Sequence, residues 1–289
     1  MEQVVFLNGK LVPRSEARVS AFDLGFLYGY ALFETMRAYS GHIFRLRDHL
    51  NRLGRSAQVI GIPLDASPLE RACYDTLKAN RLADARVRLT VSIGEGEGAP
   101  DAPAHPQPTV LIAATSYTPP PPEKYRDGFR AIVSSVRQNS GSPLSRLKSA
   151  NYLNNLLARR EAREAGADEA LLLNERGFLS EGSTSNIFVV SGGALITPDE
   201  ESGCLPGVTR QVVIGLAAAM GMAVSQREIR LEELVLADEC FITNSLIELM
   251  PLGEVDGKRI GGTGGAAEKR PATRRLMAAY REMVAEEVK

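Results

Sequence analysis

The stretch Ser145-Arg146-Leu147-Lys148-Ser149-Ala150-Asn151-Tyr152-Leu153-Asn154-Asn155 passes from a loop that contains proline and serine into a segment with helical apolar spacing. Lys148 therefore stands at the boundary of an expected helix over 150–165. Most lysines in such a place are solvated surface residues. Two further motifs decide whether this lysine has a chemical role.

The second motif, Ser180-Glu181-Gly182-Ser183-Thr184-Ser185-Asn186-Ile187-Phe188, places a lone carboxylate just before an apolar strand. The third, Leu205-Pro206-Gly207-Val208-Thr209-Arg210, opens an expected helix over 208–220. The free N–H groups at that helix start and the Thr209 hydroxyl suit a phosphate group. A lysine for a Schiff base, an acid for a pyridinium nitrogen and a phosphate cradle are what pyridoxal 5'-phosphate (PLP) needs.

The composition is that of a soluble globular protein of 289 residues with a net charge of -1. This charge gives no argument for a nucleic-acid or membrane partner. The start of the chain lacks the features of a signal peptide, and no apolar run is long enough to span a bilayer. The odd number of scattered cysteines favours reduced thiols, so we expect a cytoplasmic protein. The cysteines are Cys73, Cys204 and Cys240.

Pro119-Pro120-Pro121-Pro122 is the clearest boundary in the chain. Four prolines form neither helix nor central strand, and they make a stiff extended connector. We therefore expect a smaller N-terminal domain over 1–118, a linker over 119–122, and a larger C-terminal domain over 123–289 that carries Lys148.

Both halves mix expected strands and helices, which predicts an α/β (α+β) fold class. In the first half, Asn8-Gly9 is a strong hairpin signal. The expected strands are 31–39, 86–93, 109–114, 129–136, 169–173, 186–190, 194–197 and 239–243; the expected helices include 68–79, 150–165, 208–220 and 272–288.

Two further polar positions are candidates for a phosphate site. Arg52 shares a helix face with His49, and it could pair with a phosphate dianion or be a solvated helix arginine. Ser245 belongs to Thr243-Asn244-Ser245, which ends an apolar strand, and this turn could hold a phosphate or a substrate carboxylate. The plainer interpretation is a simple polar turn.

Arg86 and Arg88 point the same way on their expected strand, because side chains alternate. Two arginines on one face suit carboxylate recognition, and they equally suit a wet sheet face. Tyr28, Phe33, Thr35 and Arg37 flank the turn at 25–30 and could line a pocket or pack. His42 and His105 have no partner at metal-ligand spacing, so we expect no metal.

The chain resembles the fold-type IV (class IV) PLP enzymes, which include branched-chain aminotransferases, D-amino-acid aminotransferases and aminodeoxychorismate lyases. The resemblance runs nearly end to end. It implies a two-domain chain with PLP between the domains, and a homodimer whose sites the partner completes. The motifs are Phe33-Glu34-Thr35-Met36-Arg37, His49-Leu50-Asn51-Arg52-Leu53, Lys148-Ser149-Ala150-Asn151-Tyr152-Leu153, Glu181 to Phe188, Leu205 to Arg210 and Thr243-Asn244-Ser245.

The resemblance also implies roles for individual residues. Lys148 resembles the catalytic Schiff-base lysine, Glu181 the partner of the pyridine nitrogen, and Tyr152 the tyrosine near the ring oxygen of the cofactor. The phosphate ligands would be Arg52, the Val208 N–H, Thr209 and Ser245. The substrate residues would be Tyr28, Phe33, Thr35, Arg37, Arg88 and Leu246.

These motifs favour an aminotransferase that moves an amino group between a branched-chain L-amino acid and a 2-oxo acid through a Lys148 aldimine. Arg88 matches an arginine of the branched-chain enzymes, although Arg86 replaces their tyrosine. Thr35 stands where the lyases often have a catalytic threonine, so an aminodeoxychorismate lyase that releases pyruvate and 4-aminobenzoate is the alternative. The short spacing from Lys148 to Tyr152 also suits a D-amino-acid aminotransferase. A PLP-binding protein without strong turnover is the plainest alternative.

Overall fold

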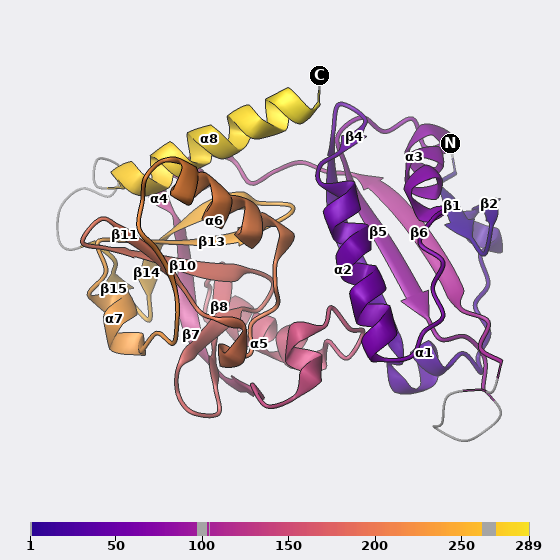
Figure 1. The fold of residues 1–289 in the computed structure, drawn as a ribbon, viewed down its shortest axis with the longest axis horizontal. Coiled ribbons are helices and arrows are strands. Elements are labelled where there is room, and N and C mark those ends of the chain that lie inside the picture. The colour runs from indigo at the N-terminus through magenta and orange to yellow at the C-terminus, as the bar shows by residue number, and fades with distance from the viewer. Residues whose placement is uncertain (1, 97–102, 104, 262–269, 289) are drawn as a thin grey trace. The chain divides into compact units, whose positions relative to one another are not determined.

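The computed structural model describes residues 2–96, 103, 105–261 and 270–288. The contacts of the chain divide it into two units (Figure 1). The first unit takes in residues 1–118 and 147–151, and the second takes in 119–146 and 152–287. Each unit has a sheet of its own.

The first unit is built on an antiparallel six-stranded sheet with the order β2-β1-β6-β5-β3-β4. The expected hairpin at Asn8-Gly9 is confirmed, and both residues have the positive φ that such a turn requires. The strands are β1 (Val4–Leu7), β2 (Lys10–Pro13), β3 (Ala31–Tyr39), β4 (His42–Ile43), β5 (Ala85–Ser92) and β6 (Thr109–Ser116); the helices are η1 (Arg14–Glu16), α1 (Leu24–Tyr28), α2 (Leu46–Val59) and α3 (Leu69–Ala79).

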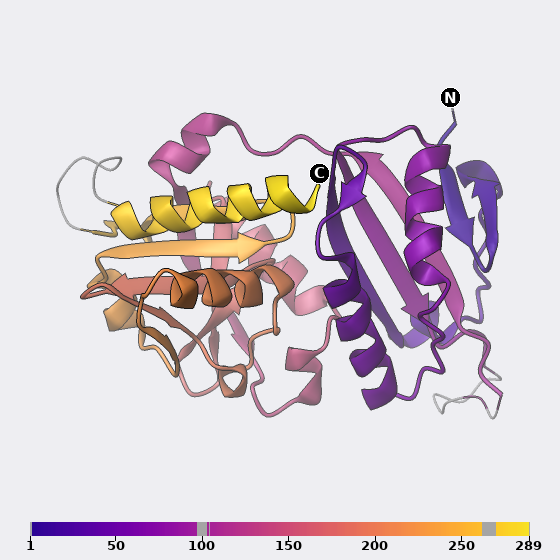
Figure 2. The ribbon, with the colours of Figure 1, turned by 45° about the horizontal axis from the view of Figure 1, so that its top comes forward.

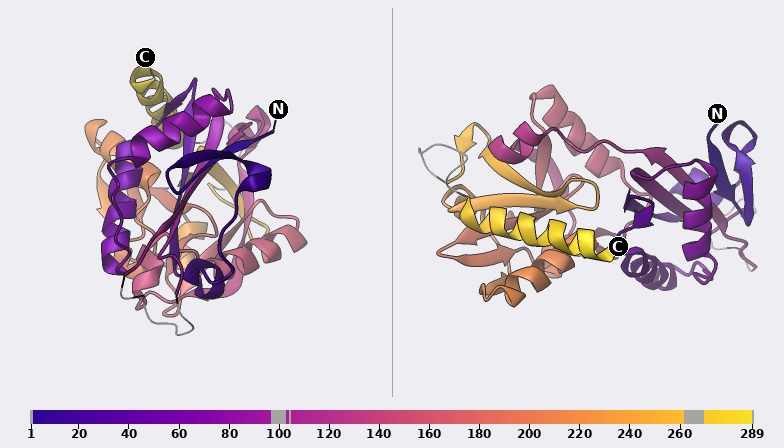
Figure 3. Two further views of the ribbon diagram at one scale, coloured as in Figure 1. Left: turned by 90° about the vertical axis from the view of Figure 1, so that its right-hand side faces the viewer. Right: turned by 90° about the horizontal axis from the view of Figure 1, so that it is seen from above.

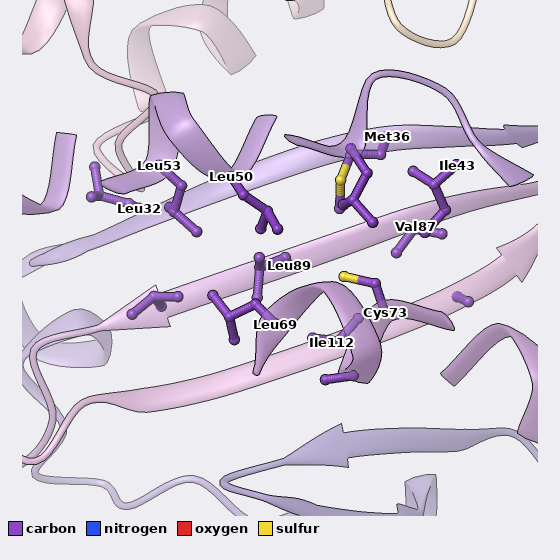
Figure 4. Close-up of a cluster of buried hydrophobic side chains, with 14 of the residues drawn as sticks. Leu32, Met36, Ile43, Leu50, Leu53, Leu69, Cys73, Val87, Leu89 and Ile112 are labelled. Atoms are coloured by element: carbon purple, nitrogen blue, oxygen red, sulfur yellow. The ribbon is translucent and has the colours of Figure 1, made fainter. Parts of the chain in front are cut away.

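Helices α2 and α3 cover one face of this sheet (Figure 2). Val87, Leu89 and Val91 point into that face and are fully buried, as the alternation along β5 predicts. Figure 4 shows Leu50 and Leu53 of α2 and Leu69 and Cys73 of α3 against Met36 and Leu89 of the strands. The other side chains of β3 and β5 therefore lie on the opposite face of the sheet.

The second unit has a nine-stranded mixed sheet with the order β12-β11-β10-β13-β14-β7-β8-β9, and β15 pairs with β14. Helix α5 packs on β7 and β8, while α6 and α8 contact each other and β13 (Figure 3). The expected mixed α/β class is confirmed. The strands are β7 (Phe129–Gln138), β8 (Glu169–Asn174), β9 (Leu179–Gly182), β10 (Asn186–Ser191), β11 (Ala194–Thr197), β12 (Val224–Gln226), β13 (Glu239–Asn244), β14 (Glu248–Val255) and β15 (Lys258–Arg259); the helices are α4 (Pro122–Asp127), η2 (Pro143–Arg146), α5 (Leu153–Glu164), η3 (Glu200–Ser202), α6 (Val208–Ala219), α7 (Leu231–Val235) and α8 (Pro271–Glu287).

The segment around Lys148 differs from the expectation in two ways. Helix α5 begins at Leu153 and not at residue 150, because the preceding residues pair with β3. The same pairing groups residues 147–151 with the first unit, whereas the sequence placed Lys148 in the C-terminal domain. Pro122, the last proline of the expected linker, is the first residue of α4, a position that proline favours.

Candidate active site

Lys148 is held against the start of β3 by backbone hydrogen bonds. The Phe33 N–H donates to the Lys148 carbonyl at 2.9 Å, and the Ala150 N–H donates to the Ala31 carbonyl at 2.8 Å. Ser149 forms a β-bridge with Leu32 between them. The Lys148 Nζ lies 4.7 Å from the centroid of the Phe33 ring. Its backbone is therefore fixed like that of a strand residue, which suits a side chain that must be held in one place.

Four of the expected substrate residues lie on the sheet face opposite to α2 and α3, where Phe33 is buried and the other three are partly buried. They are Phe33, Thr35 and Arg37 of β3 and Arg88 of β5, which stands opposite Thr35 in the register. The Arg88 guanidinium lies 3.9 Å from the Phe33 ring centroid, and its Nε donates to the Thr90 hydroxyl at 3.3 Å. Arg88 and Lys148 thus contact the same aromatic ring.

Arg37, its neighbour Arg86 and Tyr28 have different surroundings. The Arg37 guanidinium stacks on the Tyr39 ring, 4.2 Å from its centroid, and also lies near Tyr117. Arg86 stands opposite Arg37 and is exposed. Tyr28 ends α1 with 51% of its surface exposed, so it belongs to an apolar surface rather than to the buried part of the unit.

Arg52 is buried on α2 and paired with Glu34 of β3. The Arg52 Nε and Nη2 donate to the two carboxylate oxygens at 2.8 and 2.5 Å, and the His49 Nδ1 lies 2.7 Å from Oε2. Burial opposes ionisation of Glu34, but Arg52 and His49 outweigh it and lower the pKa of the carboxyl to about 2. Burial lowers the pKa of His49, so its ring is neutral at pH 7 and donates from Nδ1.

The partnership of Glu34 with Arg52 was missed from the sequence. The helical spacing paired His49 with Arg52 as neighbours on one helix face, and both do turn toward the sheet. No local signal joins them to Glu34, which lies 18 residues before Arg52.

In the second unit, Glu181 is tied to the chain that leads into α6. It lies on β9, it is buried, and its carboxylate accepts a hydrogen bond from the Leu205 N–H at 2.9 Å. The Leu205 carbonyl in turn accepts from the Asn186 side chain at 2.8 Å. These contacts bring the second and third sequence motifs together.

Helix α6 begins at Val208 with Gly207 as its N-cap, and no side chain caps its first N–H groups. A Cβ on Gly207 would lie 2.0 Å from the Asn186 Oδ1, so any larger residue there requires Asn186 to move. Val208 and Thr209 are buried at this helix start. A 12-residue helix with uncapped N–H groups is a suitable site for a phosphate.

Tyr152 and Ser245 lie close to the same loop. The Tyr152 hydroxyl donates to the Ser183 carbonyl at 3.0 Å. The Asn244 side chain donates to the Thr184 carbonyl at 3.1 Å, and its Oδ1 accepts from the Leu246 and Ile247 N–H groups. The turn that carries Ser245 and Leu246 is therefore fixed beside the loop that follows Glu181.

Each unit, taken by itself, holds groups of the kind that PLP requires. The first unit has a lysine with a fixed backbone, and the second has a buried carboxylate and an uncapped helix start. Thr243 stands opposite Asn186 in the register of β13 and β10. Its hydroxyl is buried and has no hydrogen-bond partner among the described residues, which leaves a donor for a bound group. Within the ranges that the structure describes, no group of three metal-ligand side chains occurs, and no helix has the length and apolar character to cross a bilayer.

Comparisons with known proteins agree on one family. The sequence profile described as amino-transferase class IV matches residues 31–255. A protein of Methanocaldococcus jannaschii that carries the name of a branched-chain-amino-acid aminotransferase is 43% identical over 259 residues, which is 89% of each chain. A protein of Bacillus subtilis named aminodeoxychorismate lyase is 35% identical over 268 residues, 91% of this chain and 90% of the relative.

Solved structures give the same result for the fold. The crystal structure of the Escherichia coli branched-chain aminotransferase covers all of this chain and 97% of its own, with a TM-score of 0.92 and 32% identity. The branched-chain aminotransferase of Thermobaculum terrenum, solved in its PLP form, covers 99% of this chain and 95% of its own, with a TM-score of 0.87 and 31% identity.

Proposed function

Because this chain belongs to the class IV aminotransferase family, we propose that it moves the amino group of branched-chain L-amino acids to a 2-oxo acid. It is a PLP-dependent transaminase. The observation that carries the proposal is the identity of 34 to 43% to branched-chain enzymes over nearly the full length, joined to a lysine fixed at the start of β3.

The roles of the residues follow from their chemistry. Bound PLP withdraws electrons from the substrate and so acidifies its Cα–H bond. Lys148 would hold the cofactor covalently, and its amine, once the amine of the substrate has displaced it, would carry a proton on Nζ. Glu181, whose carboxyl group already accepts from the Leu205 N–H, would keep the pyridine nitrogen protonated. We assign the phosphate to Arg52, the Val208 N–H, Thr209 and Ser245.

We assign substrate recognition to the sheet face of the first unit opposite to α2 and α3. The Phe33 ring gives an apolar surface for a branched side chain, and Arg88 gives a cation for the second carboxylate of an acidic substrate. Thr35 and Arg37 share this face. Tyr28 and Leu246 complete the proposed set of substrate residues.

We also propose a homodimer in the cytoplasm. Phe22, Phe26, Leu27 and Tyr28 form a run of exposed large side chains in and before α1, and Phe26 is 75% exposed. Exposed aromatic groups of this kind are typical of interfaces between protein chains. The three cysteines are free thiols, which fits a reducing compartment. Sedimentation of the purified protein tests the dimer, and a monomer at micromolar concentration contradicts it.

An absorbance experiment tests the reaction. Holoenzyme is mixed in separate cuvettes with L-leucine, L-glutamate, D-alanine and D-glutamate, and the visible band of bound PLP is followed. We expect the band to disappear with the two L-amino acids. Loss only with the D-amino acids would instead identify a D-amino-acid aminotransferase.

The second candidate is aminodeoxychorismate lyase, which Thr35 and the Bacillus subtilis relative favour. In that reaction the same Cα deprotonation is followed by loss of pyruvate. Thr35 lies opposite Arg88 on the same sheet face, where a hydroxyl could assist the departing group. A holoenzyme whose band persists with every amino acid, but which releases pyruvate from aminodeoxychorismate, would support the lyase.

A further inference from the structure

A buried carboxylate holds the loop that follows Glu181. Glu169, the first residue of β8, is only 2% exposed. It accepts hydrogen bonds from the hydroxyls of three consecutive residues: Ser183 at Oε1, and Thr184 and Ser185 at Oε2 with distances of 3.2 and 2.9 Å. A buried carboxylate with several donors is a strong anchor, because each broken contact leaves a polar group unsatisfied.

Two more groups meet the same carboxylate. The Ala170 N–H donates to Oε1 at 2.9 Å, and Arg159 of α5 approaches Oε1 at 3.7 Å. The Ser183 N–H donates to the Ala170 carbonyl at 2.8 Å. The loop is therefore fixed on β8 through its backbone as well as its hydroxyls.

The carbonyl of Ser183 receives two donors from the start of α5. The Tyr152 hydroxyl and the Asn155 side chain each donate to it at 3.0 Å. Both residues lie on one face at the beginning of this helix. The position of this carbonyl therefore fixes the position of the Tyr152 oxygen.

We infer that Glu169 is a positioning residue of the active site, which acts on the Tyr152 hydroxyl through the Ser183 carbonyl. The inference rests on the proposed function and on the role that the family resemblance implies for Tyr152, next to the ring oxygen of PLP. The phenol has one proton, which it donates to Ser183 in this structure. When the proton turns toward another acceptor, Asn155 still satisfies the carbonyl, so the change leaves no buried group without a partner.

A pH titration of the holoenzyme tests this inference. The visible absorption band of the bound cofactor is recorded against pH for the wild type, Tyr152→Phe, Glu169→Gln and the double variant. Because a phenol near the ring oxygen changes the proton affinity of the cofactor, we expect Glu169→Gln to shift the midpoint by about 0.5 pH units or more. We expect no further shift from Glu169→Gln when Tyr152 is already phenylalanine.

Glu161→Gln is the matched control. Glu161 also binds serine hydroxyls in the second unit, at Ser134 with 2.6 Å and at Ser135, and within the described part of the chain it has no hydrogen bond to the loop over 183–185. We expect its midpoint to equal that of the wild type. If Glu169→Gln fails to fold, the variants Ser183→Ala and Ser185→Ala take its place in the same titration. Each of them removes one hydrogen bond to the Glu169 carboxylate.

The possible outcomes distinguish a failure of this inference from a failure of the proposed function. A folded Glu169→Gln protein with an unchanged midpoint overturns the inference, and so does an equal shift in the Tyr152→Phe background. Either result leaves the proposed function standing. A wild-type protein that forms no absorbing complex with PLP contradicts the proposed function, and with it the inference.

Discussion

Arg52 and Glu34 form a buried, two-pronged ion pair between α2 and β3, with N···O distances of 2.8 and 2.5 Å. His49 donates to the same carboxylate, so three donors meet two oxygens. The pair uses one edge of the guanidinium and sets the direction of the whole group, because the guanidinium is planar. A residue assigned to the cofactor phosphate is thus oriented from within the first unit.

Glu34→Gln is expected to destabilise the protein in a pH-dependent way. The pKa of Glu34 is lowered from 4.5 to about 2, so its ionisation stabilises the fold above about pH 4.5, and this contribution is lost as the pH falls toward 2. The variant should lose about 3 kcal/mol of unfolding free energy at pH 7 and much less at pH 3. Urea unfolding at both pH values measures this difference.

Glu70→Gln is the control for that experiment, because Glu70 meets Arg47 at 3.7 Å on the exposed surface. Its effect should stay below about 1 kcal/mol at either pH. An equal loss for Glu34→Gln at pH 7 and pH 3 would mean that packing, and not charge, explains the role of this residue.

Lys148→Ala is expected to lower the rate of transamination by at least about 10³-fold, because the variant has no group to move the proton. Lys148→Arg keeps a positive charge near the Phe33 ring but offers no amine for covalent attachment. Single-turnover kinetics with L-leucine measure both variants. A Lys148→Ala protein with wild-type turnover would refute every catalytic proposal made for this chain.

Arg88→Leu is expected to change KM for an acidic substrate more than KM for branched substrates. The loss of one charge-assisted contact should raise KM for 2-oxoglutarate by about 10- to 100-fold and change KM for the branched 2-oxo acids much less. Steady-state kinetics with each 2-oxo acid measure the ratio. Arg86→Leu is the matched control, because Arg86 lies on the same strand face but is exposed. Equal effects of the two substitutions on KM would mean that the overall positive charge of this strand, and not a direct contact with Arg88, attracts the acidic substrate.

Local periodicity predicted most strands and helices of this chain. The alternation along β5 gave the buried face correctly, and the spacing of apolar residues gave α3, α6 and α8 within two residues. The predicted start of α5 was wrong, because Ser149 pairs with Leu32, which lies more than a hundred residues earlier in the chain. A local pattern cannot contain a contact of that range.

Some residues of the candidate site could be predicted from local sequence and others could not. Lys148, Glu181 and the start of α6 carry signals within a few residues: a helix boundary, a lone acid before a strand, and a glycine before a helix. Glu34 and Glu169 have no such local signal, because their roles depend on hydrogen-bond partners that are distant in the sequence and come close only in the folded chain. From sequence alone, an acidic residue in a strand is predicted to be exposed, and only the structure shows the donors that allow it to be buried.

Gly207→Ala is expected to weaken PLP binding by about 10-fold, which corresponds to about 1.4 kcal/mol. The added Cβ would lie 2.0 Å from the Asn186 Oδ1, so Asn186 must move and release the Leu205 carbonyl. Leu205 also donates to Glu181, so the change reaches the start of α6 and the proposed partner of the pyridine nitrogen together. Equilibrium titration of the apoenzyme with PLP measures the change.

Gly215→Ala is the matched control within the same helix. A Cβ at Gly215 meets nothing within 4 Å among the described residues, so alanine should leave the PLP affinity unchanged. It should also raise the unfolding free energy by about 0.5–1 kcal/mol, because alanine favours a helix interior over glycine. Unchanged affinity in a folded Gly207→Ala protein would show that Asn186 moves without cost, and that the start of α6 does not depend on the close approach at Gly207.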